Sequence, residues 1–194
     1  MAGRPRIIDR DKVLDAAEAI IIRSGVAALS FETVAKAAGI TKGGVQYCFG
    51  TRDKLIRAMI ERWGDSFERE VLSRSGGDSS PRAIIRAHLE ATRDSGEAEY
   101  SRSAVMMLAQ LQRPDQVAEV REWYNARLSP LDLADPADRA AALALLAGEG
   151  AFMLRAFGLV DLTDEQWNAL FADLLARVKS SGGPGEAPVA AGAD

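Results

Sequence analysis

Residues 30–49 read SFETVAKAAGITKGGVQYCF, and this segment decides the fold. Ser30 is placed to cap a first helix, because its side-chain oxygen can accept from an unpaired backbone N–H. The apolar residues of that helix recur at helical spacing and are Phe31, Val34, Ala35 and Ala38. Gly39 can take the left-handed conformation that ends it, and Thr41 can cap a second helix. The segment therefore predicts a helix-turn-helix, with Val45 and Phe49 on the inner edge of its second helix.

The outer face of the second helix carries small and polar residues, namely Thr41, Lys42, Gly43, Gly44, Gln46 and Tyr47. Such a helix fits the major groove of DNA, where Gln46 can pair with an adenine edge. Lys42 supplies positive charge, and the hydroxyl of Tyr47 can reach a phosphate. Each glycine costs the helix about 1 kcal/mol relative to alanine, which suggests a close approach of the backbone to a partner. The alternative is an ordinary helical corner, because helix-turn-helix patterns also match by chance.

Residues 9–63 resemble the DNA-binding domain of the TetR (AcrR-type) family of transcriptional regulators. The likeness rests on Gly25, Ser30, the run AKAAGITKG at 35–43, Tyr47, Phe49 and the run TRDKL at 51–55. Gln46 and Cys48 depart from the family pattern, which commonly has Tyr and His at these places, so the operator sequence is not implied. The resemblance implies an all-α protein. Its N-terminal three-helix head would span 9–63, and its larger helical body, for ligand binding and dimerisation, would span 64–180.

Motif and resemblance together give a set of expected DNA-binding residues: Arg4, Arg6, Ser30, Thr33, Thr41, Lys42, Gly43, Gly44, Gln46, Tyr47 and Arg52. The first two lie in residues 1–8, which we expect to be a flexible basic arm that enters a minor groove. A plain solvated terminus is the alternative. Arg52 lies at the start of a helix expected from Thr51 to about Ser73. There it can hold a phosphate with help from the helix dipole, or pair with surface carboxylates.

Charge is unevenly divided along the chain, which has a net charge of -4. Residues 1–64 hold 11 Lys and Arg against 7 Asp and Glu, whereas the remaining residues hold 13 against 21. A basic head suits a phosphate backbone, and an acidic body keeps the rest of the molecule away from it. Chance unevenness is the alternative interpretation.

Composition argues against other classes of protein. The chain has 194 residues, 47% hydrophobic and 27% charged, which is the balance of a soluble globular protein. No apolar run reaches the ~18 residues that span a bilayer, so we expect a cytoplasmic protein without a membrane partner. With one Cys and one His, an internal disulfide and a His-rich metal site are excluded, and no cofactor is expected.

Catalysis has little support in the sequence. No nucleophile motif such as G-x-S-x-G accompanies His88, so a structural or pocket-lining role is favoured for this residue. Cys48 is expected to be a small filler beside the second helix of the motif, and a redox sensor is the alternative. We therefore expect a protein that is not an enzyme.

Further helices are expected at 81–94, 98–112, 115–128, 136–158 and from Thr163 to about Val178. Met and aromatic side chains in such helices usually form a core, but they also suit an adaptable ligand pocket, as the resemblance implies. The residues expected to line that pocket are Trp63, Phe67, His88, Met106, Met107, Gln110, Trp123 and Phe152.

The last two helices are apolar enough to bury a wide face. The resemblance implies that they form a two-fold interface of four helices, with Leu143, Leu146, Ala147, Leu154, Trp167, Leu170, Phe171 and Leu174. A monomer that buries both helices in its own body is the alternative. Residues 181–194 are expected to be a disordered tail.

The resulting hypothesis is a homodimeric repressor that binds a near-palindromic operator in double-stranded DNA. A small hydrophobic or amphiphilic effector would release it by changing the distance between the heads. Two alternatives come from other classes. One is a helical protein-interaction module without sequence-specific DNA binding, and the other is a small-molecule enzyme or carrier built on the helical body.

Overall fold

The computed structural model describes residues 8–96, 99–100, 102–103, 107 and 114–178. Every regular element in these residues is helical, which confirms the all-α prediction. In chain order they are α1 (Arg10–Ser24), η1 (Val26–Ala28), α2 (Phe31–Ala38), α3 (Lys42–Phe49), α4 (Arg52–Arg74), α5 (Pro81–Arg93), α7 (Pro114–Leu128), α8 (Pro136–Ala156) and α9 (Asp164–Arg177).

Most helices begin where the sequence predicts. Side-chain oxygens of Ser30, Thr41, Thr51 and Thr163 each accept from a backbone N–H in the first turn, as expected of capping residues. Gly39 has φ of 66° at the end of α2, in the left-handed region that favours glycine. The short helix η1 was not expected. The helix expected at 98–112 falls largely outside the described residues, although the five described there are helical.

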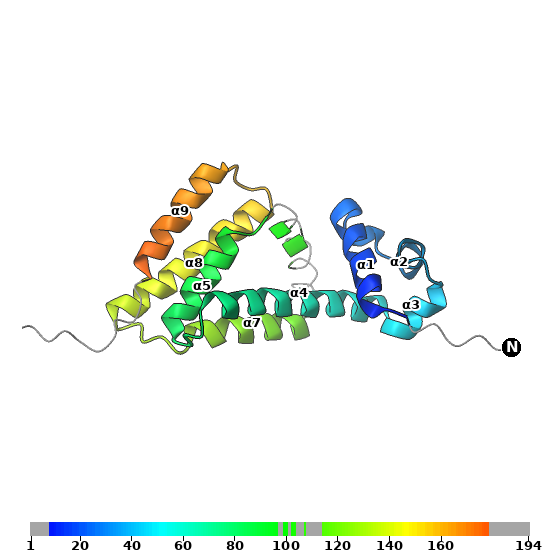
Figure 1. Ribbon diagram of the computed structural model, residues 1–194, viewed down its shortest axis with the longest axis horizontal. Helices are drawn as coiled ribbons and strands as arrows, with labels where there is room; N and C mark the ends of the chain where they lie inside the picture. The colour runs from blue at the N-terminus through cyan, green and yellow to red at the C-terminus, as the bar shows by residue number, and fades with distance from the viewer. Residues whose placement is uncertain (1–7, 97–98, 101, 104–106, 108–113, 179–194) are drawn as a thin grey trace, which may run out of the picture.

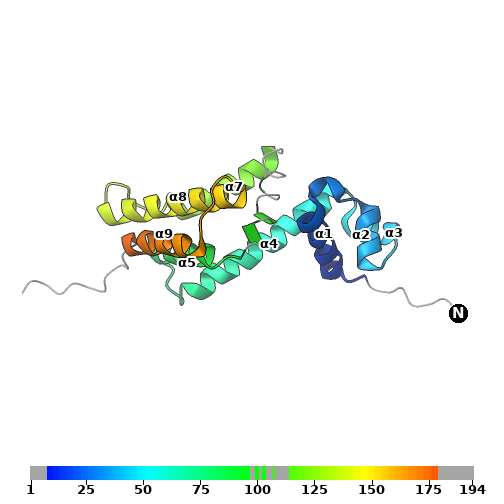
Figure 2. The ribbon, with the colours of Figure 1, turned by 90° about the horizontal axis from the view of Figure 1, so that it is seen from above.

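The molecule has two parts that are joined by the long helix α4. Helices α1, α2 and α3 pack at one end with the first turns of α4 and form the head (Figure 1). At the other end of α4, α5 packs against it, and α7, α8 and α9 pack with α5 to form the body. In both views α3 lies at the outer end of the head, far from α8 and α9 (Figure 2). The expected boundary at 63/64 lies inside α4.

Each part has its own hydrophobic core. In the head, α1 supplies Val13, Ala17, Ile20 and Ile21, which pack with Val34, Val45, Phe49, Leu55 and Met59. In the body, Ile85 and Leu89 of α5 pack with Leu145 of α8 and with Trp167 and Phe171 of α9. Two separate cores joined by one continuous helix let the head and the body keep their own shapes when their relative position changes.

The body core corrects part of the predicted dimer interface. Trp167, Phe171 and Leu174 are buried within the subunit, and Phe171 has no exposed surface. They face α5 and α8 because the apolar stripe of α9 covers the subunit's own core. The other predicted interface residues are exposed, namely Leu143, Leu146, Ala147, Leu154 and Leu170. Of the residues predicted to form the dimer interface, three therefore lie in the core of the subunit and five lie on its surface.

No helix among those described has the length and hydropathy of a membrane span. Nor do the described residues group three His, Cys, Asp or Glu side chains as a metal site would.

Candidate functional site

Helix α3 has a buried and an exposed face. Val45 and Phe49 are buried in the head core, whereas Lys42, Gly43, Gln46 and Tyr47 are exposed. Tyr47 is 89% exposed, which is unusual for an aromatic side chain because burying it would remove a large apolar area from water. A helix that leaves such a residue in solvent at the outer end of the molecule presents a contact surface.

The structure offers an explanation for the glycine at position 44 that the sequence did not indicate. A Cβ atom at this position would lie 2.9 Å from Cδ1 of Ile8 and 3.3 Å from Oγ1 of Thr41. A larger residue here would make the end of the Ile8 side chain move, so contacts within the protein itself favour a small residue at this position. A Cβ at Gly43 would meet only Oγ1 of Thr41, at 4.0 Å, so Gly43 is the glycine that leaves room on the outer face.

Ser30 and Thr33 hold the start of α2 in place. The hydroxyl of Ser30 accepts from the backbone N–H of Thr33 at 3.1 Å, and the hydroxyl of Thr33 accepts from the N–H of Ser30 at 3.0 Å. The two side chains form a reciprocal capping box. Thr41 is engaged in the same way, since its hydroxyl accepts from the N–H of Gly44 at 3.0 Å. The caps of Ser30 and Thr41 are those that the sequence predicted, whereas the hydrogen bonds of Thr33 were not predicted.

Arg52 is held by backbone carbonyl groups of the head, which the sequence did not predict. Its Nε donates to the carbonyl oxygen of Leu29 at 2.8 Å, and its Nη2 donates to that of Val26 at 2.6 Å. The side chain thus ties the start of α4 to the segment before α2. The structure therefore gives Arg52 a structural role in the head, and the phosphate contact expected of it stays a prediction.

Arg10 supports α3 from the start of α1, and sequence reasoning missed it. Its Nη1 donates to the carbonyl oxygen of Cys48 at 3.1 Å, and its guanidinium lies 4.7 Å from the centre of the Phe49 ring. The two partners are 38 and 39 residues away, so no local pattern reveals the contact. The expected arm residues Arg4 and Arg6 lie outside the described residues.

The body contains a buried network of polar side chains that starts at His88. Arg127 Nε donates to His88 Nδ1 at 3.2 Å, so His88 Nε2 is the nitrogen that donates to Glu149, at 2.5 Å. The hydroxyl of Tyr124 donates to the other oxygen of Glu149 at 2.5 Å. Arg127 also donates to Glu68 of α4 at 2.5 Å. The network links α4, α5, α7 and α8.

Burial and hydrogen bonding set the charges in this network. Burial opposes ionisation of Glu149, but the hydrogen bonds from His88 and from the Tyr124 hydroxyl, together with the charge of Arg127, outweigh it and lower the pKa of Glu149. Burial, together with the negative charge of Glu149, raises the pKa of Tyr124 far above its ordinary value. The network therefore holds a carboxylate and a protonated phenol at neutral pH.

Three of the predicted pocket residues meet at this network, to which His88 itself belongs. The rings of Phe67 and His88 are 5.1 Å apart, and those of His88 and Trp123 are 5.6 Å apart. The structure does not bring Trp63 and Phe152 to them, because Trp63 packs on the head core and Phe152 packs on Tyr100. Met107 is half-buried, and Met106 and Gln110 lie outside the described residues.

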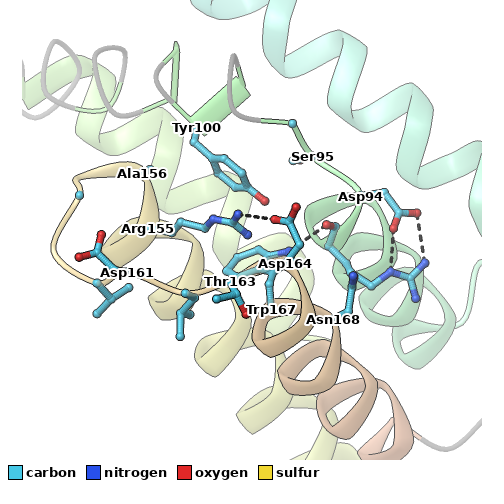
Figure 3. Close-up of a pocket in the computed structure, with 15 residues that line it drawn as sticks. Asp94, Ser95, Tyr100, Arg155, Ala156, Asp161, Thr163, Asp164, Trp167 and Asn168 are labelled. Carbon is cyan, nitrogen blue, oxygen red and sulfur yellow. Dashed lines mark hydrogen bonds and ion pairs between the residues drawn. The ribbon is translucent and has the colours of Figure 1, made fainter.

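A cleft of about 890 Å³ lies elsewhere in the body, and no sequence pattern predicted it. It is formed by the end of α5, the end of α8, the loop that follows and the start of α9, with Tyr100 at its wall (Figure 3). Arg155 lies inside it between two aromatic rings, 4.9 Å from the centre of Tyr100 and 4.8 Å from that of Trp167.

Comparisons with protein families and known structures place both parts of the chain. Residues 13–59 match the family described as "Bacterial regulatory proteins, tetR family". Residues 82–179, just over half of the chain, match the family described as "Tetracyclin repressor-like, C-terminal domain".

A curated relative matches part of the chain. It is the HTH-type transcriptional regulator BetI of Paraburkholderia xenovorans (strain LB400), 30% identical over 96 residues. The match covers 47% of this chain and 49% of that protein, so the chain matches about half the length of this relative.

Solved structures share the fold over most of its length. A TetR-like transcriptional regulator from Rhodococcus sp. RHA1 has a TM-score of 0.62 and 23% identity, covering 91% of this chain and 96% of that one. The multidrug binding protein EbrR, solved with imidazole, has a TM-score of 0.60 and 23% identity, covering 85% and 93%.

Proposed function

This chain belongs to the TetR family of DNA-binding transcriptional regulators, which are not enzymes, and we propose that it is a ligand-released repressor. It binds a palindromic operator in double-stranded DNA as a homodimer. A small hydrophobic or amphiphilic molecule that binds the body releases it. The observation that carries the proposal is the exposed face of α3, which includes the almost fully exposed Tyr47.

The chemistry of that face supports DNA as the partner. Gln46 offers an amide that can pair with an adenine edge, Lys42 offers charge, and Tyr47 offers a hydroxyl to phosphate. Gly43 leaves space beside them. Arg4 and Arg6 extend this surface in the proposal, whereas Ser30, Thr33 and Thr41 serve it through the helix caps that orient α2 and α3.

Exposed leucines support a second copy of the chain as the other partner. Leu143 is 60% exposed on α8, and three further leucines are exposed on α8 and α9: Leu146, Leu154 and Leu170. Leu143, Leu146 and Leu154 recur at spacings that place them along one side of α8. Burying a contiguous apolar patch in a two-fold interface would remove it from water. Two heads held at a fixed separation would then read two half-sites.

Ligand release requires the effector to prefer the conformation that does not bind DNA. Helix α4 supports such coupling, because it starts beside α3 and its last turns pack against α5 in the body, where Val71 meets Ala87 and Ala91. Arg127 holds the body end of α4 through Glu68. The solved EbrR structure, described as that of a multidrug binding protein complexed with imidazole, shows that a protein of this fold binds a small molecule.

Selection of bound sequences from random duplex DNA, at two salt concentrations, tests the proposal. The samples are the wild type, a Lys42→Ala/Tyr47→Ala variant and a control, Arg69→Ala/Leu72→Ala, which loses one cation and one exposed apolar side chain from α4. We expect the wild type and the control to enrich an inverted repeat whose binding weakens as salt rises. The Lys42→Ala/Tyr47→Ala variant should enrich it weakly or not at all.

Other outcomes contradict the proposal in separate ways. A folded wild type that enriches no sequence would favour the helical interaction module. Enrichment of a single half-site by a monomer would support DNA binding but contradict the proposal that the protein binds as a dimer. Sedimentation of Leu146→Glu, expected to be monomeric, checks the dimer directly, because a charge at a buried apolar contact is costly.

A further inference from the structure

The cleft between α5, α8 and α9 contains two hydrogen-bond donors, Tyr100 and Arg155, that are not fully engaged by the described residues. Tyr100 is 6% exposed, and its hydroxyl has no hydrogen-bond partner among the described residues. An unpaired buried hydroxyl costs free energy, because water has been removed and nothing replaces it. Burial raises the pKa of Tyr100, against the opposing charge of Arg155, so this hydroxyl stays protonated and can donate.

Arg155 is the second donor of the cleft. A guanidinium carries five N–H groups in a planar fork. In the part of the chain that the structure describes, Arg155 gives one hydrogen bond, from Nη2 to Oδ1 of Asp164 at 2.9 Å. Figure 3 shows Tyr100 and Arg155 both directed toward Asp164.

The carboxylate of Asp164, which accepts from Arg155, is only weakly held there. Its side chain is 90% exposed, so water competes for the ion pair with Arg155. The residue is also the first of α9, where the positive end of the helix dipole and the first-turn N–H groups favour an anion. Another carboxylate that brings its own apolar contacts can therefore replace it.

The other charges of the cleft are compatible with an acidic ligand. Asp94 receives hydrogen bonds from Arg93 and from Arg74, which lower its pKa in spite of its partial burial. Its negative charge is therefore balanced by two guanidinium groups. Asp161, in the loop after α8, is exposed and is screened by water.

We propose that this cleft binds a small organic acid with an apolar body. Its carboxylate takes the place of the Asp164 side chain and accepts from Arg155 and from the Tyr100 hydroxyl. Its apolar part lies on Ala156, Val160 and Leu162, which line the same cleft. A volume of about 890 Å³ is in the range of small-molecule sites. The claim that an effector acts through this cleft rests on the proposed function. The claim that the cleft binds an organic acid does not.

Calorimetry with octanoate and with the neutral octanamide, in the absence of DNA, tests the site. We expect the wild type to bind octanoate about tenfold more tightly than octanamide, since a charge-assisted pair replaces a neutral one. Arg155→Gln should remove this preference. Asp164→Asn should strengthen octanoate binding, because the competing carboxylate is gone. Arg69→Gln, which removes an exposed arginine from α4, should leave it unchanged.

Tyr100→Phe separates a binding role from a structural one. The lost hydroxyl has no described partner, so the melting temperature of the ligand-free variant should not fall. Its affinity for octanoate should fall several-fold, while that for octanamide stays the same. This variant also keeps the test valid if Arg155→Gln does not fold.

Three results would overturn the site: equal binding of the acid and the amide, full octanoate affinity in both Arg155→Gln and Tyr100→Phe, or no binding of octanoate to the folded wild type at millimolar concentration. Adding the selected operator then tests the effector role alone. If octanoate binds and operator affinity does not change, the site remains and its effector role is rejected. Failure to bind any operator would reject the proposed function without affecting the site.

Discussion

Glu18 and Arg102 join the head to the body directly, with 2.6 Å between Oε1 of Glu18 and Nε of Arg102. The same carboxylate also receives Nη2 of Arg62, from α4, at 2.7 Å. Helix α1, the connecting helix α4 and the segment after α5 therefore meet at one carboxylate. A change in the body can reach the head through this contact as well as through α4.

A double-mutant cycle with Glu18→Gln and Arg102→Gln should measure this contact. Both side chains are mostly buried, so we expect a coupling of about 1 kcal/mol, at the upper end for ion pairs near a surface. Amide exchange in α1 should become faster in Arg102→Gln. The control is Arg82→Gln, which breaks a similarly exposed pair with Asp138 within the body and should leave α1 unchanged. A coupling energy of zero, or equal amide exchange of α1 in Arg102→Gln and Arg82→Gln, would contradict a direct link between the head and the body.

Arg52 provides a second prediction, which separates structure from DNA contact. Arg52→Lys keeps the charge but loses the planar fork that reaches the carbonyl groups of Leu29 and Val26. We expect Arg52→Lys and Arg52→Ala both to lower the free energy of unfolding by about 1 kcal/mol, a modest value because the residue is exposed. Urea denaturation measures this. If Arg52→Lys is as stable as the wild type and only Arg52→Ala weakens DNA binding, the predicted phosphate contact of Arg52 is supported instead.

Two glycines in α8 provide a matched pair of substitutions. A Cβ at Gly148 would lie 2.5 Å from Cδ2 of Leu89, in the core between α5, α8 and α9. Gly148→Ala should therefore destabilise the protein by about 1–3 kcal/mol, because overpacking outweighs the gain in helix propensity. A Cβ at Gly150 would meet nothing within 4 Å, so Gly150→Ala should stabilise it by up to about 1 kcal/mol. Thermal unfolding of both variants checks the difference, and equal effects would show that the core at Gly148 can adapt.

The buried network predicts a pH dependence of stability. The pKa of Glu149 is lower in the folded protein than in the unfolded chain, so the folded state binds fewer protons at this site. Its stabilisation is then fully present above the unfolded value of about 4.3 and is lost as pH falls through the folded pKa. Glu149→Gln should be less stable than the wild type at pH 7, and the difference should shrink below about pH 5.

Urea titrations at several pH values measure that difference. Glu122→Gln, which changes an exposed carboxylate on α7, serves as the control and should differ little from the wild type throughout. A constant difference between Glu149→Gln and the wild type, down to pH 3, would show that ionisation of Glu149 is not what stabilises the network.

Local chemistry explains why the helices were predicted well. A capping residue such as Ser30 or Thr163 acts on N–H groups within three residues, and Gly39 acts through its own φ angle. These interactions are complete within a short segment, so the sequence reveals them. The exposed face of α3 follows in the same way, because Val45 and Phe49 must turn inward and the residues between them turn outward.

The remaining features depend on residues that are far apart in the chain. The stripe of Trp167, Phe171 and Leu174 was equally suited to a partner subunit and to the subunit's own core, and only the packing of α5 and α8 decided between them. The partners of Arg52 lie 23 and 26 residues before it. Glu149, 61 residues from His88, was not recognised as its partner.

The sequence by itself determined the family, the positions of most helices and the outward face of α3, because caps, glycines and apolar periodicity act over one or two helical turns. Only the tertiary structure decided the hydrogen-bond partners of Arg52, the buried network around Glu149, the link from Glu18 to Arg102 and the cleft beside Tyr100. Each of these requires side chains from helices that are distant in sequence to meet, and the packing of whole helices sets which ones do.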